Sequence, residues 1–377
     1  MTMSHHKLYQ LLCSPAALSL ALCALCAVTL ACGRAKDVPA WDKPVLKVLD
    51  INIWSGLDYK GYVTMGEYES AQGRALRYRA LVRQIKALDA DIIGVHEANK
   101  LPGYIDTLAA DLDCDAVWHV GVGGVRAGVV GLPWNLREGD AILAKRGLGL
   151  EPVKRLQLSG GPVGNFFTFH FEDATQIIGA KVTVKGKPVY LFSTHWHASP
   201  LDDASLRAKL AQLAATRKAS VEEIKSVRDE IAAGMAWRMD ESNRTLAFVK
   251  ELAGANTALL FGDFNSTIDM PEIQQLDKEG FVNTFTAMNR EKEAHTWDPR
   301  RNENQKKHYA AAPPNPSLME ELDFWADHQQ RRIDHIFIRQ GAQQSLAPRA
   351  SRVVLDELVD GVHASDHFGI YTEFDVK

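Results

Sequence analysis

The sequence predicts one α+β domain in which two packed sheets carry helices on their outer faces. Apolar runs of strand length, rich in β-branched residues, recur from about residue 45 to the C-terminus, with helical stretches between them. Hairpins and long connections separate these runs, which favours two packed sheets. The composition, 46% hydrophobic and 24% charged, is that of an ordinary globular protein.

The first half of the domain should alternate strands with one clear helix. Residues 45–54, "VLKVLDINIW", have the β-branched character of a strand. Residues 74–89 place apolar side chains at helical spacing and predict an amphipathic helix. Residues 90–97, "ADIIGVHE", predict a buried strand that ends in polar residues, and residues 115–122 and 139–145 predict two further strands.

The second half should contain a hairpin, a helical insertion and three more strands. Residues 175–197 predict a hairpin that turns at Lys185, Gly186 and Lys187. Residues 201–236 are rich in Ala, Glu, Lys and Arg without proline, so they predict a helix or helical hairpin. The remaining strands are expected at residues 257–265, 331–339 and 367–375.

The first 35 residues have the pattern of a secretory signal peptide. Residues 8–33 contain no charged side chain, and small residues precede Cys32. Two alternatives stay open: an uncleaved membrane anchor, and a lipoprotein leader with a lipid on Cys32. In each case the domain at 45–377 is expected outside the cytoplasm, as a periplasmic, outer-membrane-attached or extracellular protein.

The positions of the cysteines and the net charge exclude several classes of protein and of metal site. Four of the five cysteines lie in the leader, so Cys114 alone remains in the body. A disulfide framework and a thiolate metal site are therefore not expected, and Cys114 is predicted to be a small buried residue. The net charge of −4 excludes a generic polyanion binder, so any attraction to phosphate must come from a local patch.

Polar side chains gather where the predicted strands end. Asp263 and Asn265 in "GDFNST" would point the same way if the segment stays extended, although a simple strand-to-loop turn is the alternative. The full set provides hard oxygen ligands that suit magnesium or manganese rather than zinc. It comprises Asn52, Glu97, His195, His197, Asp263, Asn265, Asp334, Asp366 and His367.

Six motifs, "DINIW", "HE", "STHWH", "GDFN", "RRIDHIF" and "SDH", occur in an order that resembles the endonuclease/exonuclease/phosphatase superfamily. The resemblance runs from about residue 45 to the C-terminus. It implies a four-layered α/β/β/α sandwich of two mixed, mostly antiparallel sheets flanked by helices. It also implies divalent-metal-dependent cleavage of a phosphoester by water. His96 departs from the pattern, because many members carry glutamine before the motif glutamate.

The resemblance also implies a role for each motif residue. Glu97 matches the principal magnesium ligand, Asn52 the asparagine that supports metal and phosphate, and Asp366 a second metal-site carboxylate. Asp263 would orient the attacking water, and Asn265 and His195 would contact the phosphate. Asp334 would orient His367, which is usually the general base, although the sequence does not distinguish His195 from His367 in that role.

Substrate contacts are predicted from less specific segments. "HTWDPRRNEN" resembles a segment of bacterial sphingomyelinases and some sugar-phosphatase relatives, which implies that Trp297 and Asn302 lie near the substrate. Asn135 and Arg137 are further candidates from the segment at 121–140, and the insertion at 201–236 is expected to act as a lid or support.

The substrate class stays open at this point. Arg300, Arg301, Lys306 and Lys307 could follow a nucleic-acid backbone or grip one anionic head group, so a secreted endonuclease is the second hypothesis. The third is a catalytically silent binding module. The stretch before "SDH" contains no aromatic residue, which argues against a membrane-inserting hairpin there. No protein partner is implied, and membrane attachment would run through the N-terminus.

Overall fold

The structure is a computed structural model, and it describes residues 41–57, 69–123, 126–127, 130–131, 136–159, 175–290, 292–308, 310–342 and 346–377. All of these belong to one compact unit, Trp41–Lys377. The leader predicted at 1–35, with Cys32, lies outside the described residues. No helix in the described part of the chain is both long enough and apolar enough to cross a bilayer.

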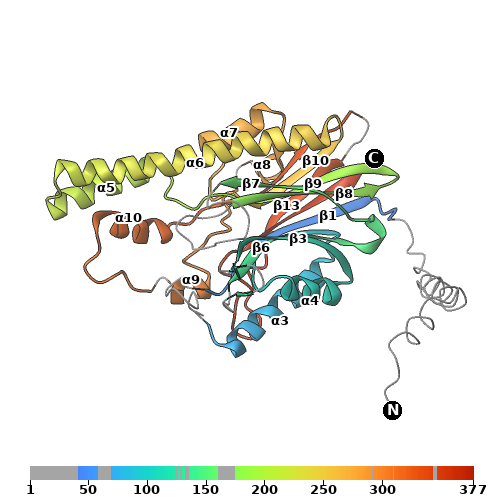
Figure 1. Ribbon diagram of the computed structural model, residues 1–377, viewed down its shortest axis with the longest axis horizontal. Helices are drawn as coiled ribbons and strands as arrows, with labels where there is room; N and C mark the ends of the chain where they lie inside the picture. Colours follow the sequence, from blue (N-terminus) through green and yellow to red (C-terminus); the bar gives the residue numbers. More distant parts are fainter. Residues whose placement is uncertain are drawn as a thin grey trace, which may run out of the picture. The chain divides into compact units, whose positions relative to one another are not determined.

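Two six-stranded sheets form the centre of this unit (Figure 1). In both sheets one pair of central strands is parallel, β1 with β2 and β9 with β10, and the other pairings are antiparallel. The first sheet has the order β13 (Leu346–Val354), β14 (Gly369–Val376), β1 (Val45–Asn52), β2 (Ile92–Ala98), β6 (Arg137–Lys145), β3 (Cys114–Gly123). The second has the order β11 (Val282–Asn283), β12 (Asp334–Arg339), β10 (Thr257–Asp263), β9 (Lys187–His195), β8 (Thr175–Val184), β7 (Glu151–Ser159).

Helices cover the outer face of each sheet, so the predicted α/β/β/α sandwich is confirmed. Helices α3 (Ala71–Leu88) and α4 (Gly103–Leu112) pack on the first sheet through one apolar cluster. Helices α6 (Val221–Ala253) and α7 (Pro271–Lys278) pack on the second. A third cluster, which includes Phe261, fills the space between the two sheets. Shorter elements complete the chain: β4 (Arg126–Ala127), β5 (Val130–Gly131), η1 (Arg146–Leu148), α5 (Ala204–Arg217), α8 (Thr284–Met288), α9 (Glu303–His308) and α10 (Leu318–Asp327).

Local chemistry explains where several elements begin and end. Helix α3 starts three residues before the predicted 74 because Ser70 accepts a hydrogen bond from the Gly73 backbone and caps it. The β8–β9 turn uses only Lys185 and Gly186, both at positive φ, so Lys187 already belongs to β9. The predicted helical insertion forms as the pair α5 and α6, and α6 continues to Ala253. Cys114 is buried and unpaired, as predicted.

A buried ion pair joins α6 to α7, and its arginine also contacts the loop that follows β9. Arg238 Nε lies 2.9 Å from Glu272 Oε1, and both side chains are fully buried. The same guanidinium donates to the Ser199 backbone carbonyl at 3.1 Å. Ser199 lines the pocket described below, so this pair fixes one part of its wall.

Replacement of Arg238 by methionine should lower the free energy of unfolding by about 3 kcal/mol, because it leaves the Glu272 carboxylate buried without its cation. Urea titration followed by circular dichroism measures this loss. The double variant Arg238→Met/Glu272→Leu is the control and should recover a large part of it. A single variant as stable as the native chain would contradict the assignment.

Candidate active site

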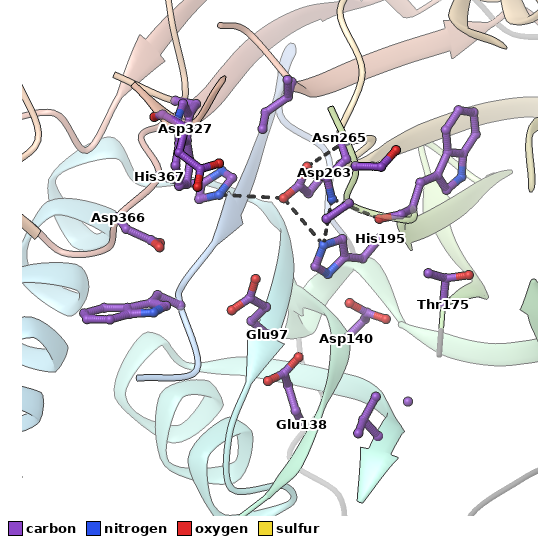
Figure 2. Close-up of a pocket in the computed structure, with 18 of the residues that line it drawn as sticks. Glu97, Glu138, Asp140, Thr175, His195, Asp263, Asn265, Asp327, Asp366 and His367 are labelled. Atoms are coloured by element: carbon purple, nitrogen blue, oxygen red, sulfur yellow. Dashed lines mark hydrogen bonds and ion pairs between the residues drawn. The ribbon is translucent and has the colours of Figure 1, made fainter. Parts of the chain in front are cut away.

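The carboxyl ends of four central strands meet at one edge of the sandwich. Strand β1 ends with Asn52, β2 carries Glu97 near its end, β9 ends with His195 and β10 ends with Asp263. Because β1 and β2 are parallel, and β9 and β10 are parallel, each pair delivers its polar ends to the same side. Glu97, His195 and Asp263 line a pocket of about 620 Å³ (Figure 2).

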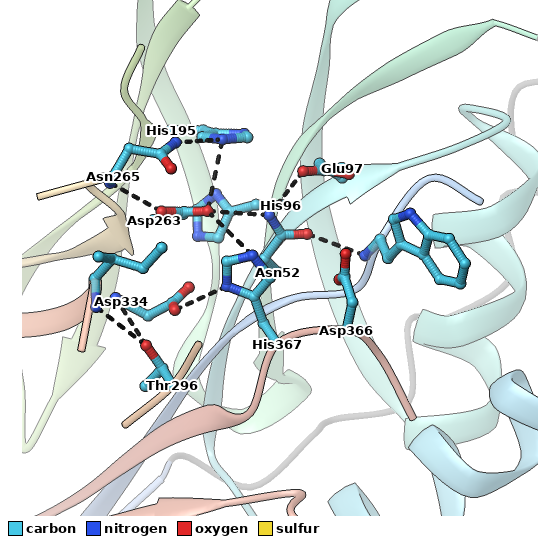
Figure 3. Close-up of polar contacts among 12 residues, drawn as sticks. Asn52, His96, Glu97, His195, Asp263, Asn265, Thr296, Asp334, Asp366 and His367 are labelled. Atoms are coloured by element: carbon cyan, nitrogen blue, oxygen red, sulfur yellow. Dashed lines mark hydrogen bonds and ion pairs between the residues drawn. The ribbon is translucent and has the colours of Figure 1, made fainter. Parts of the chain in front are cut away.

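Asp263 is the centre of the polar contacts (Figure 3). Its Oδ2 accepts a hydrogen bond from Asn52 Nδ2 at 3.1 Å. The same oxygen lies 3.6 Å from His195 Nε2 and 3.7 Å from His367 Nε2. Asn52 also donates to Glu97 Oε1 at 2.8 Å, so one amide links the two carboxylates. The side chain of Asp263 is thus held from several directions inside a buried site.

Asn265 reaches the site by a turn and not by an extended strand. Strand β10 ends at Asp263, and Asn265 has a left-handed backbone with φ of 46°. Its backbone N–H donates to Asp263 Oδ1 at 2.9 Å, as in an Asx turn. The expected extended geometry is therefore wrong, yet Asn265 Nδ2 still lies 3.2 Å from His195 Nε2. The turn itself brings the two side chains to the same place.

A second chain of contacts enters from β12 and from the segment before β14. His367 Nδ1 lies 2.9 Å from Asp334 Oδ2, and both residues are buried. The backbone N–H of Asp334 donates to Thr296 Oγ1 at 3.2 Å, which fixes the carboxylate that orients the imidazole. His367 therefore presents Nε2 to the pocket and to Asp263. This matches the orientation that the sequence resemblance implied for Asp334 and His367.

The electrostatics of the site are set by burial and by the close approach of opposite charges. Burial alone would lower the pKa of His367, but Asp334 and Asp263 raise it well above its ordinary value. Burial would raise the pKa of Asp263, yet His367 and His195 hold it below its usual range. Asp263 is therefore an anion between two imidazoles, suited to accept hydrogen bonds from water and from its neighbours.

Two groups of side chains could hold a metal ion. Asp263, Asp334 and His367 offer ligand atoms within 4.8 Å of one another, and all three are buried. The other group is Glu97 and Asp366, with Asn52 hydrogen-bonded to Glu97. Burial and the charge of Glu97 raise the pKa of Asp366 to about 6, although the nearby His367 opposes this. The oxygen donors of this second group fit a hard divalent cation.

His96 lies beneath the site and bridges two buried carboxylates. Its Nε2 is 2.8 Å from Asp50 Oδ1, and its Nδ1 is 3.1 Å from Asp140 Oδ1. Asp140 also accepts from Gln176 Nε2 at 2.8 Å, and both Asp140 and Gln176 line the pocket. His96, Asp140 and Gln176 thus connect the two sheets. His96 directly precedes Glu97, whose backbone has a positive φ of 57°. His96 therefore occupies a position from which it fixes the end of β2.

The four predicted substrate contacts have different outcomes. Trp297 lines the pocket, and its ring centroid lies 5.1 Å from that of His367. Asn302 is fully buried and donates to the backbone carbonyls of Ser365 and Asp366, so it supports the loop that carries Asp366 and does not line the pocket. Arg137 is exposed at the start of β6 and does not line the pocket. Asn135 lies outside the described residues.

Several lining residues were not identified from the sequence. His195 lines the pocket. His197 does not, and its ring stacks on that of Trp237 with the ring centroids 3.9 Å apart. Helix α10 contributes Asp323 and Asp327, whose segment carries no recognisable motif. Arg331, which the sequence places with Arg332 in the basic patch considered for contact with phosphate, also lines the pocket. Other unpredicted lining residues are Trp54, Asp140, Thr175, Gln176 and Trp196.

Comparisons with known proteins agree with this geometry. The profile of the Endonuclease/Exonuclease/phosphatase family matches residues 51–367, and the chain belongs to this family. No curated protein sequence matches the chain. Its fold is similar to that of humanized D. rerio TDP2, with a TM-score of 0.55, 15% identity, and 89% of this chain and 100% of that chain covered.

Two bacterial structures are equally similar in fold. One is an endonuclease/exonuclease/phosphatase from Bacteroides vulgatus, with a TM-score of 0.55, 14% identity, and 89% and 100% of the two chains covered. The other is the mannosyl-6-phosphatase Bt3783 of Bacteroides thetaiotaomicron, with a TM-score of 0.54, 16% identity, and 87% and 99% covered. At these identities the likeness shows the shared fold alone. The family and the buried acidic and histidine cluster together define a hydrolase of phosphoester bonds.

Proposed function

We propose that this chain is an exported, magnesium-dependent phosphoesterase that hydrolyses a phosphodiester or phosphomonoester by metal-assisted attack of water. The observation that carries this proposal is the convergence of Glu97, His195, Asp263, Asp366 and His367 on one pocket, with Asn52 hydrogen-bonded to Asp263 and Asp334 hydrogen-bonded to His367. Export rests on the uncharged apolar run at residues 8–33, and a lipid on Cys32 would attach the protein to a membrane.

Each side chain has a role that its contacts support. Glu97 and Asp366, with Asn52, would hold the cation, which when bound neutralises phosphate charge and lowers the pKa of water. Asp263 accepts a hydrogen bond from the attacking water and aligns it. His195 and Asn265 contact phosphate oxygens from the β9 and β10 side. His367, held through Nδ1 by Asp334, moves the proton at Nε2.

A secreted endonuclease is the alternative, and TDP2 from D. rerio has been solved with a single strand DNA product. The positive charge of the segment that contains Arg300, Arg301, Lys306 and Lys307, on which the endonuclease hypothesis rests, is partly neutralised. Arg301 pairs with Asp356 at 2.5 Å, and Lys306 pairs with Glu303 at 2.7 Å. Asp323 and Asp327 add negative charge to the pocket wall, which disfavours a polyanionic strand. These contacts support a small phosphoester.

Removal of the metal is expected to abolish turnover. The purified chain should hydrolyse p-nitrophenyl phosphate or bis-p-nitrophenyl phosphate with magnesium or manganese, and chelation should lower the rate at least about 10²-fold, because a Lewis acid contributes several kcal/mol to such a transition state. Magnesium added in excess should restore the rate, as measured by release of nitrophenol.

Two results would overturn this proposal. Nicking of plasmid DNA without turnover of either small ester would favour the endonuclease. Calorimetry that detects no magnesium binding by folded protein would favour the catalytically silent binding module.

A further inference from the structure

One wall of the pocket is built by elements outside the catalytic motifs. Helix α10 presents Asp323 and Asp327 to the pocket, one helical turn apart, and Arg331 follows four residues later. We call these three residues the α10 wall. Leu318, Leu322 and Ala326 of the same helix pack against apolar residues of α5 and α6. The helical insertion thus holds α10 in place over the site.

The α10 wall is also fixed to the catalytic floor. Trp297 Nε1 donates to the Asp327 backbone carbonyl at 2.8 Å. The backbones of Trp297 and Arg331 exchange hydrogen bonds, each at 2.9 Å, and Trp297 contacts His367 edge to face. Groups bound at the wall would therefore sit next to the phosphate position and not at a remote surface.

No side-chain hydrogen bond or ion pair of the three wall residues is found in the described part of the chain. Burial lowers the pKa of Arg331, and the charges of the nearby Asp203 and Asp327 oppose this. Asp323 Oδ1 and Arg331 Nη2 are buried atoms without a hydrogen bond. No ion pair within 4.0 Å joins Arg331 to either aspartate in the part of the chain described here. Burial and the neighbouring Asp323 raise the pKa of Asp327 to about 7. Buried polar groups of this kind require hydrogen bonds that a ligand can supply.

The chemistry of the wall selects among ligands. A cationic group would meet Arg331, and an anionic group would meet two carboxylates. A hydroxyl group both donates and accepts, so a polyhydroxylated, uncharged group can serve the carboxylates as donor and the guanidinium as acceptor. Trp297 offers an aromatic surface for the C–H groups of such a ligand. The pocket volume of about 620 Å³ lies in the range of small-molecule sites.

We propose that the α10 wall binds the alcohol part of the substrate, and that this substrate is a phosphate ester of an uncharged, polyhydroxylated alcohol such as a sugar or polyol. This inference rests on the proposed function, because it assigns the substrate class of the same site. Asp323 and Asp327 accept hydrogen bonds from the hydroxyl groups, and Arg331 donates to them. The proposal makes these three residues determinants of specificity.

The test compares matched esters that differ only in the alcohol. The diester pair is p-nitrophenyl phosphoinositol and p-nitrophenylphosphocholine, and the monoester pair is mannose 6-phosphate and phosphocholine. The simple p-nitrophenyl and bis-p-nitrophenyl phosphates report the basic chemistry. With magnesium, kcat/KM for the polyol member should exceed that of the choline member at least tenfold. In Asp327→Asn and Arg331→Gln, the ratio of kcat/KM for the polyol ester to that for the nitrophenyl ester should fall about tenfold, the value of one charge-assisted hydrogen bond.

The control is Asp277→Asn, an exposed aspartate of α7 that does not line the pocket, which should leave the ratio unchanged. Preference for the choline ester, or an equal loss on all esters, would overturn the wall proposal while nitrophenyl turnover upholds the proposed function. If no ester is hydrolysed, the wall proposal is tested by binding. Calorimetry then measures the affinity of the Asp263→Asn variant for mannose 6-phosphate. Binding that weakens tenfold on adding Asp327→Asn supports the wall, and no binding overturns it.

Discussion

Replacement of Asp263 by asparagine is expected to lower kcat/KM by about 10³-fold, within the range that positioned proton-handling groups contribute. Asparagine has nearly the shape of aspartate but only one acceptor oxygen. Asp263 Oδ2 faces Asn52 Nδ2 and two imidazole nitrogens, and Oδ1 accepts from the Asn265 backbone N–H. Whichever way the amide is turned, its NH₂ group faces a donor, so the water can no longer be aligned.

The measurement is steady-state hydrolysis of a nitrophenyl ester with magnesium, together with thermal unfolding to show that the variant is folded. Asp91→Asn is the matched control, because Asp91 is also fully buried and accepts from Lys43 at 2.9 Å, but near the other end of β1 and β2. It should lose stability and keep its kcat/KM. Activity of Asp263→Asn within fivefold of the native chain would remove Asp263 from the mechanism.

The sequence predicted the sandwich because its strands are strongly patterned. The runs at 45–54, 90–97 and 257–265 are largely apolar, the first two are also rich in β-branched residues, and each carries a polar residue near its end, at the edge where the site forms. Strand β7 was not expected, because "EPVKRLQLS" is half exposed and mostly polar. Strand β13 was not expected either, since its alternation is interrupted by a bulge between Pro348 and Ala350. Edge strands of this kind depend on pairing and not on their own hydrophobicity.

The site was predictable where a motif couples residue type to a strand end, and not elsewhere. Asp263, His367 and Glu97 follow this pattern, and the structure brings them together. Asn302 also lies in a motif, but its contacts are with the backbone of residues 365 and 366, which spacing does not reveal. The α10 wall depends on how α10 docks onto the insertion, a tertiary contact that leaves no periodic signal in "LMEELDFWAD".

Replacement of His96 by leucine is expected to lower the free energy of unfolding by about 5 kcal/mol, the upper end of the cost of breaking a buried ionic contact. His96 is fully buried between Asp50 and Asp140, and its removal leaves two carboxylates without their shared partner. The anion of Asp50 is already poorly stabilised, because burial raises its pKa to about 6 and its Oδ2 has no hydrogen bond among the described residues.

The comparison with His96→Gln separates charge from hydrogen bonding. A glutamine amide can still donate to Asp50 or Asp140, so this variant should lose less than half as much stability as His96→Leu in urea titrations. The surroundings leave little room for a different arrangement, since a Cβ at Gly94 would lie 2.3 Å from Asp50 Oδ1. Equal losses in the two variants would mean that packing alone, and not the bridge between two carboxylates, accounts for the contribution of His96 beneath the site.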